Sequence, residues 1–296
     1  MSAKPFIKWV GGKTQLLPEI RQKYPEIITR YCEPFVGGGA VLFDVLQNFH
    51  PEEVLINDIN PELINLYVEV RDNCEFLIQV LNRLQAEYLE TPEDKRQTLY
   101  LEKRSTYNHY ILEQNPENNL EKAALFIYLN KTCFNGLYRV NRKGLFNVPF
   151  NRAKNPLICD ADNLRECSHL LQNVQMHIGD YSCCRDFIDG NTFVYIDPPY
   201  RPLTVTSSFT SYSENEFCDA QQIELGNFIT EIARRGALVV ASNSDPRNAD
   251  SQDDFFDNLY ADFNVERVQA SRMVNSNAEK RGPINELLIS NIAVMF

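Results

Sequence analysis

Glycines and apolar segments alternate near the N-terminus in a way that restricts the fold more than any other feature of the sequence. Arg30-Tyr31-Cys32 is an extended segment that leads into Gly37-Gly38-Gly39, after which the apolar residues take up helical spacing. A second apolar segment ends at Asp58, and Asn60-Pro61-Glu62 then supplies a helix N-cap, a proline for the first helical position and an acid for the first turn. We therefore predict a strand, a glycine turn and a helix, followed by a second strand and a second helix.

The rest of the chain continues this alternation around a long helical segment. From about Pro61 to Asn130 the pattern is helical, with apolar residues at every fourth position from Phe76 to Tyr88. After Lys154, strands are predicted at TFVYID, ALVVAS and ELLISNIAVMF, and a helical face is formed by Leu225, Phe228, Ile229 and Ile232. This order predicts an α/β fold with a doubly wound, mostly parallel sheet, whose ligand crevice lies at the carboxyl ends of the strands.

Positive charge is concentrated in two short segments of an acidic chain. The net charge of -11 excludes a general affinity for polyanions, because the protein as a whole repels phosphate. Residues 131–154 nevertheless contain six basic residues and no acid, namely Lys131, Arg139, Arg142, Lys143, Arg152 and Lys154, while Lys4, Lys8 and Lys13 precede the first acid, Glu19. Either segment alone is typical of a solvated loop. Their coincidence with the motifs described below favours two binding segments.

Cysteines, histidines and hydropathy exclude several other classes of protein. The eight cysteines are scattered without a C-x-x-C pair, and the four histidines form no cluster with zinc-site spacing. We therefore expect reduced cysteines and no metal. Because no eighteen apolar residues occur in succession, we also expect no membrane span and a cytoplasmic location.

The first glycine turn has the features of a cofactor site. Glycine lets the backbone adopt positive φ and approach a ligand closely, and Asp58 follows at the distance where an acid accepts hydrogen bonds from ribose hydroxyls in such folds. A tight turn beside an acidic helix-capping residue explains the same pattern without a ligand. Gly11-Gly12-Lys13-Thr14 lacks the earlier glycine of a P-loop, so ATP binding is not predicted.

Asp197-Pro198-Pro199-Tyr200 follows a buried strand directly and places a carboxylate and an aromatic ring at its carboxyl end. An adenine amine is a poor nucleophile because its lone pair is delocalised into the ring. Acceptors on its two hydrogens draw it toward tetrahedral geometry. Asp197 and the carbonyl of Pro198 can be these acceptors, and Tyr200 can stack on the base; the alternative is a capped strand end with a Pro-Pro turn.

Seven motifs of the chain resemble, in order, those of the Dam family of DNA adenine methyltransferases, the α-group. They are Lys8-Trp9-x-Gly-Gly-Lys13, Glu33-Pro34-Phe35-x-Gly-Gly-Gly39, Asn57-Asp58, Phe134-Asn135-Gly136-Leu137-Tyr138-Arg139, Phe146-Asn147-Val148-Pro149-Phe150, Gly179-Asp180-Tyr181 and Asp197-Pro198-Pro199-Tyr200. The resemblance implies a class I methyltransferase-like domain formed by residues 1–60 and 155–296, which binds S-adenosylmethionine. It also implies an inserted domain of helices and a hairpin at residues 61–154, which recognises the DNA target.

The resemblance further implies roles for individual residues. The cofactor is expected to contact Trp9, Lys13, Phe35, Gly37, Gly39, Asp58, Asp180 and Tyr181, and the extruded adenine to contact Asp197, Pro198, Pro199 and Tyr200. DNA is expected to contact Lys8, Phe134, Asn135, Leu137, Arg139, Pro149, Arg152 and Thr204. Physically, Arg139 can bond guanine O6 and N7, Leu137 can touch a thymine methyl, and Phe134 can fill the gap that a flipped adenine leaves. Arg152 and Thr204 match positions of phosphate contacts, which fix register.

The function expected from sequence is therefore adenine-N6 methylation of duplex DNA, with GATC as the target that the hairpin segments resemble. Methylation of RNA adenine or of a protein glutamine amide is an alternative, since related proline-containing tetrapeptides serve planar amines generally. A DNA-binding relative without catalysis is another. We expect a monomer that needs no metal, and a restriction endonuclease that cuts the same site is a candidate partner.

Overall fold

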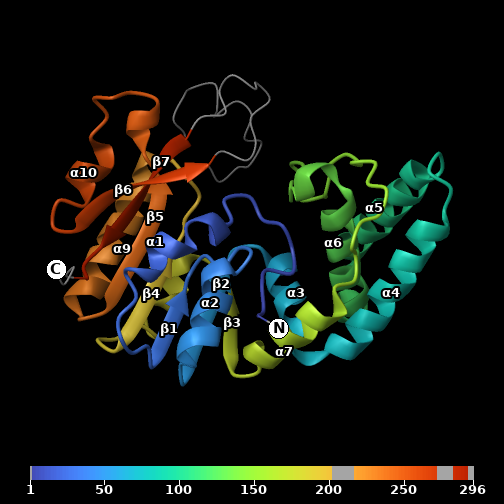
Figure 1. Cartoon of the computed structure of the whole chain (residues 1–296), viewed down its shortest axis with the longest axis horizontal. Coiled ribbons are helices and arrows are strands. Elements are labelled where there is room, and N and C mark those ends of the chain that lie inside the picture. The colour runs from blue at the N-terminus through green and yellow to red at the C-terminus, as the bar shows by residue number, and fades with distance from the viewer. Residues whose placement is uncertain (1, 202–216, 272–282, 293–296) are drawn as a thin grey trace. The chain divides into compact units, whose positions relative to one another are not determined.

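The computed structural model describes residues 2–201, 217–271 and 283–292 (Figure 1). The strands are β1 (Arg30–Glu33), β2 (Glu53–Asp58), β3 (Val174–Ile178), β4 (Thr192–Ile196), β5 (Leu238–Ser244), β6 (Asn264–Ser271) and β7 (Pro283–Ser290). They form a seven-stranded sheet in the order β3-β2-β1-β4-β5-β7-β6. The pairs β1/β2, β1/β4 and β4/β5 are parallel, whereas β7 is antiparallel to both β5 and β6. The predicted α/β fold with a mostly parallel sheet is thus confirmed.

Helices alternate with these strands and also fill the long segment between β2 and β3. They are α1 (Leu17–Arg21), α2 (Ala40–Phe49), α3 (Pro61–Asp72), α4 (Cys74–Glu90), α5 (Arg96–Glu113), α6 (Asn119–Thr132), α7 (Ala161–Leu171), α9 (Asp219–Arg234) and α10 (Phe255–Leu259). Short 3-10 helices lie at η1 (Lys13–Gln15), η2 (Pro116–Asn118), η3 (Phe134–Gly136), η4 (Tyr181–Cys184) and η5 (Pro246–Asn248). No helix in the described part of the chain is long and apolar enough to cross a membrane.

The chain divides into two compact units. We call Met1–Gly12, Gly37–Asn48 and Asn60–Ile178 the helical unit, and Lys13–Val36, Phe49–Ile59 and Gly179–Phe296 the sheet unit. All strands except β3 belong to the sheet unit. The assignment of residues 61–154 to DNA recognition is a statement about function and stays a prediction.

The sheet unit is organised around β4, which is buried at all five positions. A strand of a parallel sheet that is covered on both faces requires such a continuous apolar run. Val194 and Ile196 pack in a cluster with the buried face of α9, which consists of Leu225, Phe228, Ile229 and Ile232 as predicted. On the other face, the ring of Phe193 lies 5.8 Å from that of Tyr31.

In the helical unit, α6 lies at the centre and packs against α3, α4 and α5 (Figure 1). Its low amphipathicity fits this position, because residues on all sides of α6 are buried. The spacing predicted for α4 is wrong at one end, since Phe76 is 62% exposed. The buried face of α4 begins instead at Leu77 and continues through Leu81 and Leu84.

The predicted start of α3 is confirmed in detail and allows a first test. Asn60 accepts hydrogen bonds from the backbone N–H groups of Glu62 (3.1 Å) and Leu63 (3.3 Å). Asn60→Ala should lower the free energy of unfolding by about 1 kcal/mol, because these N–H groups lose their acceptor. Urea denaturation measures the difference. Asn118→Ala is the matched control, because Asn118 precedes α6 without making a side-chain cap bond; an equal loss in both variants would contradict the capping role.

Candidate active site

The parallel strands of the sheet unit bring acidic residues to one edge of the sheet. Glu33 ends β1, Asp58 ends β2, and Asp197 follows the last residue of β4. The strands β2, β1 and β4 are hydrogen-bonded neighbours that run in the same direction. The carboxyl ends of these strands are therefore where a ligand crevice is expected in a doubly wound fold.

A buried asparagine of β2 links two other segments at this edge. The side-chain amide of Asn57 donates hydrogen bonds to the carbonyls of Pro34 (2.9 Å) and Gly179 (3.0 Å). Its oxygen accepts a hydrogen bond from Cys183 Sγ at 3.2 Å. The end of β2, the loop after β1 and the segment beginning at Gly179 are thereby held together. The sequence motif included Asn57, but its role as a connector could not be read from the sequence.

Four of the predicted cofactor residues lie on these linked loops. The rings of Phe35 and Tyr181 are 5.5 Å apart and tilted by 30°. Asp58 is half-buried, and its carbonyl accepts a hydrogen bond from the N–H of Gly179 (3.1 Å). The exposed Asp180 caps η4 by accepting a hydrogen bond from the N–H of Ser182. An aromatic pair beside a carboxylate offers a flat apolar surface and an acceptor for hydroxyl groups.

The glycine turn lies in the helical unit and requires glycine for two reasons. Gly37 and Gly39 have φ values of 48° and 72°, which side chains rarely adopt. A Cβ at Gly37 would lie 2.8 Å from the ring of Trp9, and a Cβ at Gly39 would lie 2.4 Å from the hydroxyl of Tyr67. That hydroxyl donates a hydrogen bond to the carbonyl of Gly37 (3.0 Å). Trp9, Gly37 and Gly39, which were predicted to contact the cofactor, are thus brought together in one packed turn.

Asp197 is partly exposed and already engaged by two side chains. Lys13 Nζ lies 2.7 and 2.8 Å from its two carboxylate oxygens, and Ser242 Oγ donates to Oδ1 at 2.9 Å. Ser242 is 3.0 Å from the hydroxyl of Tyr195. Since the hydrogen of Ser242 is used toward Asp197, Tyr195 is the donor of that bond, and burial raises its pKa well above the usual value. Ser242 and Tyr195 were not singled out from the sequence.

Lys13 lies beside the predicted catalytic motif. Its ammonium is 4% exposed and sits 4.8 Å from the centre of the Tyr200 ring. The hydroxyl of Tyr200 donates to Glu286 Oε2 at 2.6 Å, and burial with the charges of Asp197 and Glu286 raises the pKa of Tyr200 well above its usual value. Glu286 belongs to no sequence motif, and β7 brings it to Tyr200.

The two prolines of the motif are placed differently. Pro198 is buried, whereas Pro199 is exposed. The carbonyl of Pro199 accepts a hydrogen bond from Gln222, a fully buried residue of α9, at 3.1 Å. Gln222 in turn accepts a hydrogen bond from Asn243 of β5 (3.1 Å). The backbone of the motif is therefore tied to the helix and strand next to it.

Most of the predicted DNA-contacting residues lie on a hairpin of the helical unit. It is closed by bridges between Cys133 and Phe150 and between Val140 and Phe146. Phe134, Asn135, Arg139, Pro149 and Arg152 are exposed, and Leu137 is half-buried. Phe134, with half of its surface exposed, begins η3, and its N–H donates to the carbonyl of Pro149 (2.8 Å). Thr204 lies outside the described residues.

Arg139 lies on one arm of this hairpin and is held in place by hydrogen bonds to the other arm. Its Nε donates to the side-chain oxygen of Asn147 at 2.7 Å, and its Nη2 donates to the Asn147 carbonyl at 3.2 Å. Next to Arg139 in the chain, Tyr138 stacks on Phe126 of α6 with ring centres 4.9 Å apart, and on Trp9 at 5.7 Å. The glycine turn and the hairpin of the helical unit therefore share Trp9 as a common contact.

Lys8 lies against the same hairpin. The buried Asn130 accepts a hydrogen bond from the N–H of Lys8 and donates to the carbonyls of Lys8 and Gly136. The side chain of Lys8 packs on Gly136, where a Cβ would lie 2.7 Å from it. Burial and the nearby charge of Lys8 lower the pKa of Lys131. The two basic segments noted in the sequence thus meet at Lys8 and Lys131.

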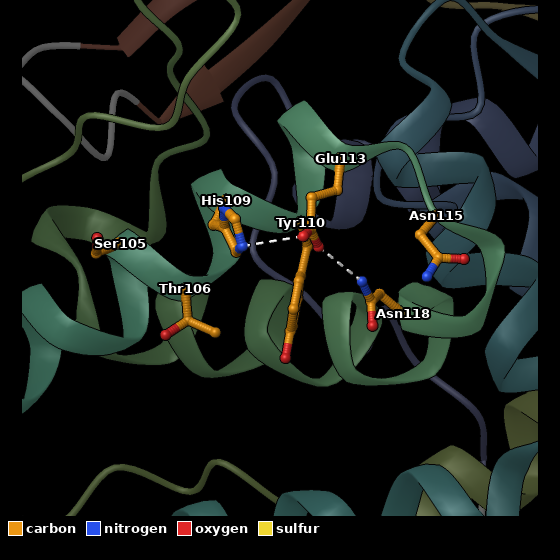
Figure 2. A pocket seen from close by; sticks show the side chains of 7 residues that line it. All are labelled: Ser105, Thr106, His109, Tyr110, Glu113, Asn115 and Asn118. Carbon is orange, nitrogen blue, oxygen red and sulfur yellow. Dashed lines mark hydrogen bonds and ion pairs between the residues drawn. The ribbon is translucent and has the colours of Figure 1, made fainter.

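The helical unit also contains a pocket that is separate from the predicted site residues. Figure 2 shows an open pocket of about 640 Å³ lined by Ser105, Thr106, His109, Tyr110, Glu113, Asn115 and Asn118. It contains none of the predicted site residues. Its polar lining includes an ion pair between His109 and Glu113 one turn apart on α5. Within residues 2–201, 217–271 and 283–292, no three acidic, His or Cys side chains are grouped to hold a metal ion.

Comparison with known proteins identifies the family. Residues 9–274 match the family model described as D12 class N6 adenine-specific DNA methyltransferase. The chain belongs to this family and is an adenine-specific DNA methyltransferase. The resemblance found in the sequence motifs is thereby confirmed.

Individual relatives are similar over nearly the whole chain. The type II methyltransferase M.MjaIII of Methanocaldococcus jannaschii is 46% identical over 98% of this chain and 100% of its own length. The type II methyltransferase M1.LlaDCHI of Lactococcus lactis subsp. cremoris is 38% identical over 98% of this chain and 96% of its own. The DNA adenine methylase of Escherichia coli K12 is 33% identical over 96% and 94%.

The glycine turn provides a test of its packing. Gly39→Ala should lower the free energy of unfolding by about 2–4 kcal/mol, because the new Cβ meets both an unfavourable φ and the Tyr67 hydroxyl. Gly144→Ala is the matched control, since Gly144 has a φ of 74° but nothing lies within 4 Å of its Cβ position; it should cost only about 1–2 kcal/mol. Equal losses in urea denaturation would show that the close packing at Gly39 contributes nothing.

Proposed function

We propose that the enzyme transfers a methyl group from S-adenosylmethionine to N6 of an adenine that is turned out of duplex DNA, with GATC as the recognition sequence. The observation that carries the proposal is the position of Asp197. Its partly exposed carboxylate follows the buried strand β4 directly, at the carboxyl ends of the parallel strands, where a ligand is expected in such a fold. Tyr200 lies three residues further on, and its hydroxyl is hydrogen-bonded.

The residues of the described chain suit the proposed cofactor. The rings of Phe35 and Tyr181 can hold an adenine ring, and Asp58 can accept hydrogen bonds from ribose hydroxyls. Gly37 presents a backbone without a Cβ atom beside Trp9, and Gly39 does so beside Tyr67. S-adenosylmethionine, when bound, supplies an electrophilic methyl group on a positively charged sulfur.

The protein's part in the reaction is to orient and polarise the amine. Asp197 and the carbonyl of Pro198 accept the two N6 hydrogens, which frees the nitrogen lone pair for in-line attack on the methyl carbon. Ser242 keeps one Asp197 oxygen in place through its hydrogen bond. The ring of Tyr200 stacks on the extruded base, and Asp197 can receive the proton that the amine releases.

Sequence specificity is assigned to the hairpin of the helical unit. Arg139 is the candidate reader of guanine, and Leu137 of a thymine methyl. Phe134 is exposed at the start of η3 and can enter the base stack. The hairpin segments resemble those of GATC-specific members. A restriction endonuclease that cuts the same site is a candidate partner. The proposed enzyme acts as a monomer in the cytoplasm.

A defined duplex tests activity and target together. Purified enzyme and S-adenosylmethionine should make a GATC duplex resistant to a nuclease blocked by adenine methylation and sensitive to a nuclease that requires it. RNA and protein substrates should receive no labelled methyl group. Methylation of a duplex without GATC at the same rate would refute the proposed target while leaving the activity in place.

Asp197→Ala should reduce methyl transfer at least about 100-fold, because one of the two acceptors for the amine is lost. Binding of S-adenosylmethionine, measured by calorimetry, should remain detectable. Asp262→Ala, which removes an exposed carboxylate outside the site, is the control and should behave like the wild type. Robust methylation by Asp197→Ala would refute the catalytic assignment.

Replacing Arg139 and replacing Arg152 should affect DNA binding in different ways. Arg139→Ala should reduce discrimination at one guanine by about 1–3 kcal/mol, because a base contact is lost. Arg152→Ala should weaken binding to all duplexes equally and make it less dependent on salt, because a phosphate contact is lost. Competition binding with GATC and single-substituted duplexes measures both. If Arg139→Ala lost the same affinity for cognate and scrambled DNA, base reading by Arg139 would be contradicted.

A further inference from the structure

Glu286 is a carboxylate of the sheet unit to which neither the sequence motifs nor the proposed mechanism gives a role. It lies on β7 and pairs in register with Ser244 of β5. Its side chain is 15% exposed. Charged groups are rarely buried to this extent without a partner. Its contacts therefore indicate what it does.

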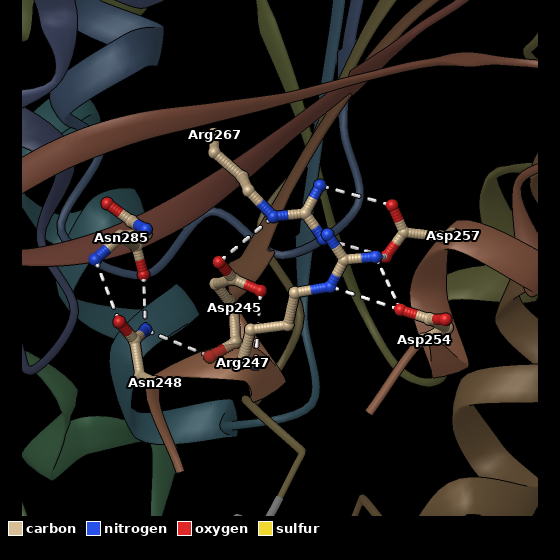
Figure 3. Close-up of polar contacts among 7 residues, drawn as sticks. All are labelled: Asp245, Arg247, Asn248, Asp254, Asp257, Arg267 and Asn285. Carbon is tan, nitrogen blue, oxygen red and sulfur yellow. Dashed lines mark hydrogen bonds and ion pairs between the residues drawn. The ribbon is translucent and has the colours of Figure 1, made fainter. Parts of the chain in front are cut away.

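The backbone next to Glu286 is fixed by a polar cluster (Figure 3). The side chain of Asn248 donates to the carbonyl of Asn285 at 2.7 Å and accepts from its N–H at 3.0 Å. The fully buried Asp245 is paired with Arg267, which also holds Asp257. The backbone that carries the Glu286 side chain is therefore held in a defined position.

Oε2 of Glu286 faces two groups of the candidate active site. It accepts the hydrogen bond of the Tyr200 hydroxyl at 2.6 Å and lies 3.9 Å from Lys13 Nζ. The raised pKa of Tyr200 keeps this hydroxyl protonated and therefore a donor. A short bond from a hydroxyl to a carboxylate is stronger than one between neutral groups. It fixes the far end of the ring that is proposed to stack on the base.

The position of Lys13 gives Glu286 a second effect. The ammonium contacts both oxygens of Asp197, the carboxylate that has to accept a hydrogen from the amine. When Asp197 takes the proton that the amine releases, the buried ammonium needs another negative partner, because an uncompensated buried charge is strongly destabilising. Glu286 is a carboxylate within reach, at 3.9 Å.

We propose that Glu286 is a positioning residue for methyl transfer, which orients the ring of Tyr200 and takes over part of the charge of Lys13 when Asp197 takes the proton that the target amine releases. This inference rests on the proposed function of Asp197 and Tyr200. It adds a residue from β7 to the site and makes Lys13 a shared partner of two carboxylates.

Single-turnover methylation of a GATC duplex by Glu286→Ala, Tyr200→Phe and the double variant tests the orienting role. Each single change should lower the rate about tenfold or more, since each removes the same charge-assisted hydrogen bond. The double variant should be no slower than the slower single variant. Affinity for S-adenosylmethionine should stay within about twofold. Rates that multiply in the double variant, or a wild-type rate for Glu286→Ala, would overturn the role.

Glu286→Gln separates charge from hydrogen bonding, because the amide can still accept from Tyr200 but does not neutralise Lys13. Its rate should lie between those of the wild type and Glu286→Ala, and a wild-type rate would overturn the sharing of charge. A duplex with 2-aminopurine at the target position should show the same altered fluorescence with Glu286→Ala and Tyr200→Phe. Unaltered fluorescence in both would contradict the orientation of the ring by Glu286.

Glu266→Ala is the matched control. Glu266 is a carboxylate on the neighbouring strand β6 and pairs with the buried Lys23 at 2.5 Å. Its loss should lower the melting temperature without changing the rate of transfer. If the wild type methylates no DNA, the proposed function fails. If the wild type is active and Glu286→Ala is equally fast, only the inference about Glu286 fails.

Discussion

The side-chain amide of Asn57 fixes the geometry on which the candidate cofactor site depends. Its two N–H groups and its oxygen are all used, one toward the loop after β1 and two toward the segment beginning at Gly179. Because Asn57 is almost completely buried, the loss of any of these bonds would leave a polar group without water. Parallel strands alone bring loops to one edge of a sheet, but they do not set the loops relative to one another. The aromatic pair of Phe35 and Tyr181 keeps its geometry because this amide connects the backbones that carry it.

A second constraint is electrostatic. Lys13 is one of the most deeply buried cations of the described chain, and it is surrounded by the carboxylates of Asp197 and Glu286 and the face of the Tyr200 ring. Tyr195 and Ser242 add a line of hydroxyl groups behind Asp197. The carboxylate that is proposed to accept the target amine is therefore oriented by the protein before any ligand arrives. Preorganisation of this kind reduces the reorganisation needed at the moment of reaction.

Much of the fold could be predicted because its signals are local. The strands ending at Asp58 and Ile196 contain apolar runs, the strand ending at Glu33 leads into a glycine turn, and the helix after Asn60 carries its own start signal. In contrast, β3 and β6 mix polar and apolar residues and were not predicted. Such mixed strands are defined by the neighbours they pair with rather than by their own composition.

The residues of the candidate site could likewise be predicted only where they belong to local sequence motifs. Asp58, Asp180 and Asp197 belong to motifs that can be recognised where they stand. Ser242 and Glu286 belong to no motif, and they reach Asp197 and Tyr200 only through the pairing of β4 with β5 and of β5 with β7. Ser242 lies 45 positions from Asp197, and Glu286 lies 86 positions from Tyr200. Local spacing in the sequence therefore could not connect these pairs.

The two hydrogen bonds from Arg139 to Asn147 affect the free energy of the proposed association with DNA. A long, flexible arginine ordinarily loses much of its rotational freedom when it meets a base, and that loss opposes complex formation. Here two hydrogen bonds across the hairpin restrict the guanidinium in the unliganded protein. Folding has already restricted this side chain, so in the proposed complex with DNA more of the energy of its contact with a nucleotide is available for discriminating one base from another.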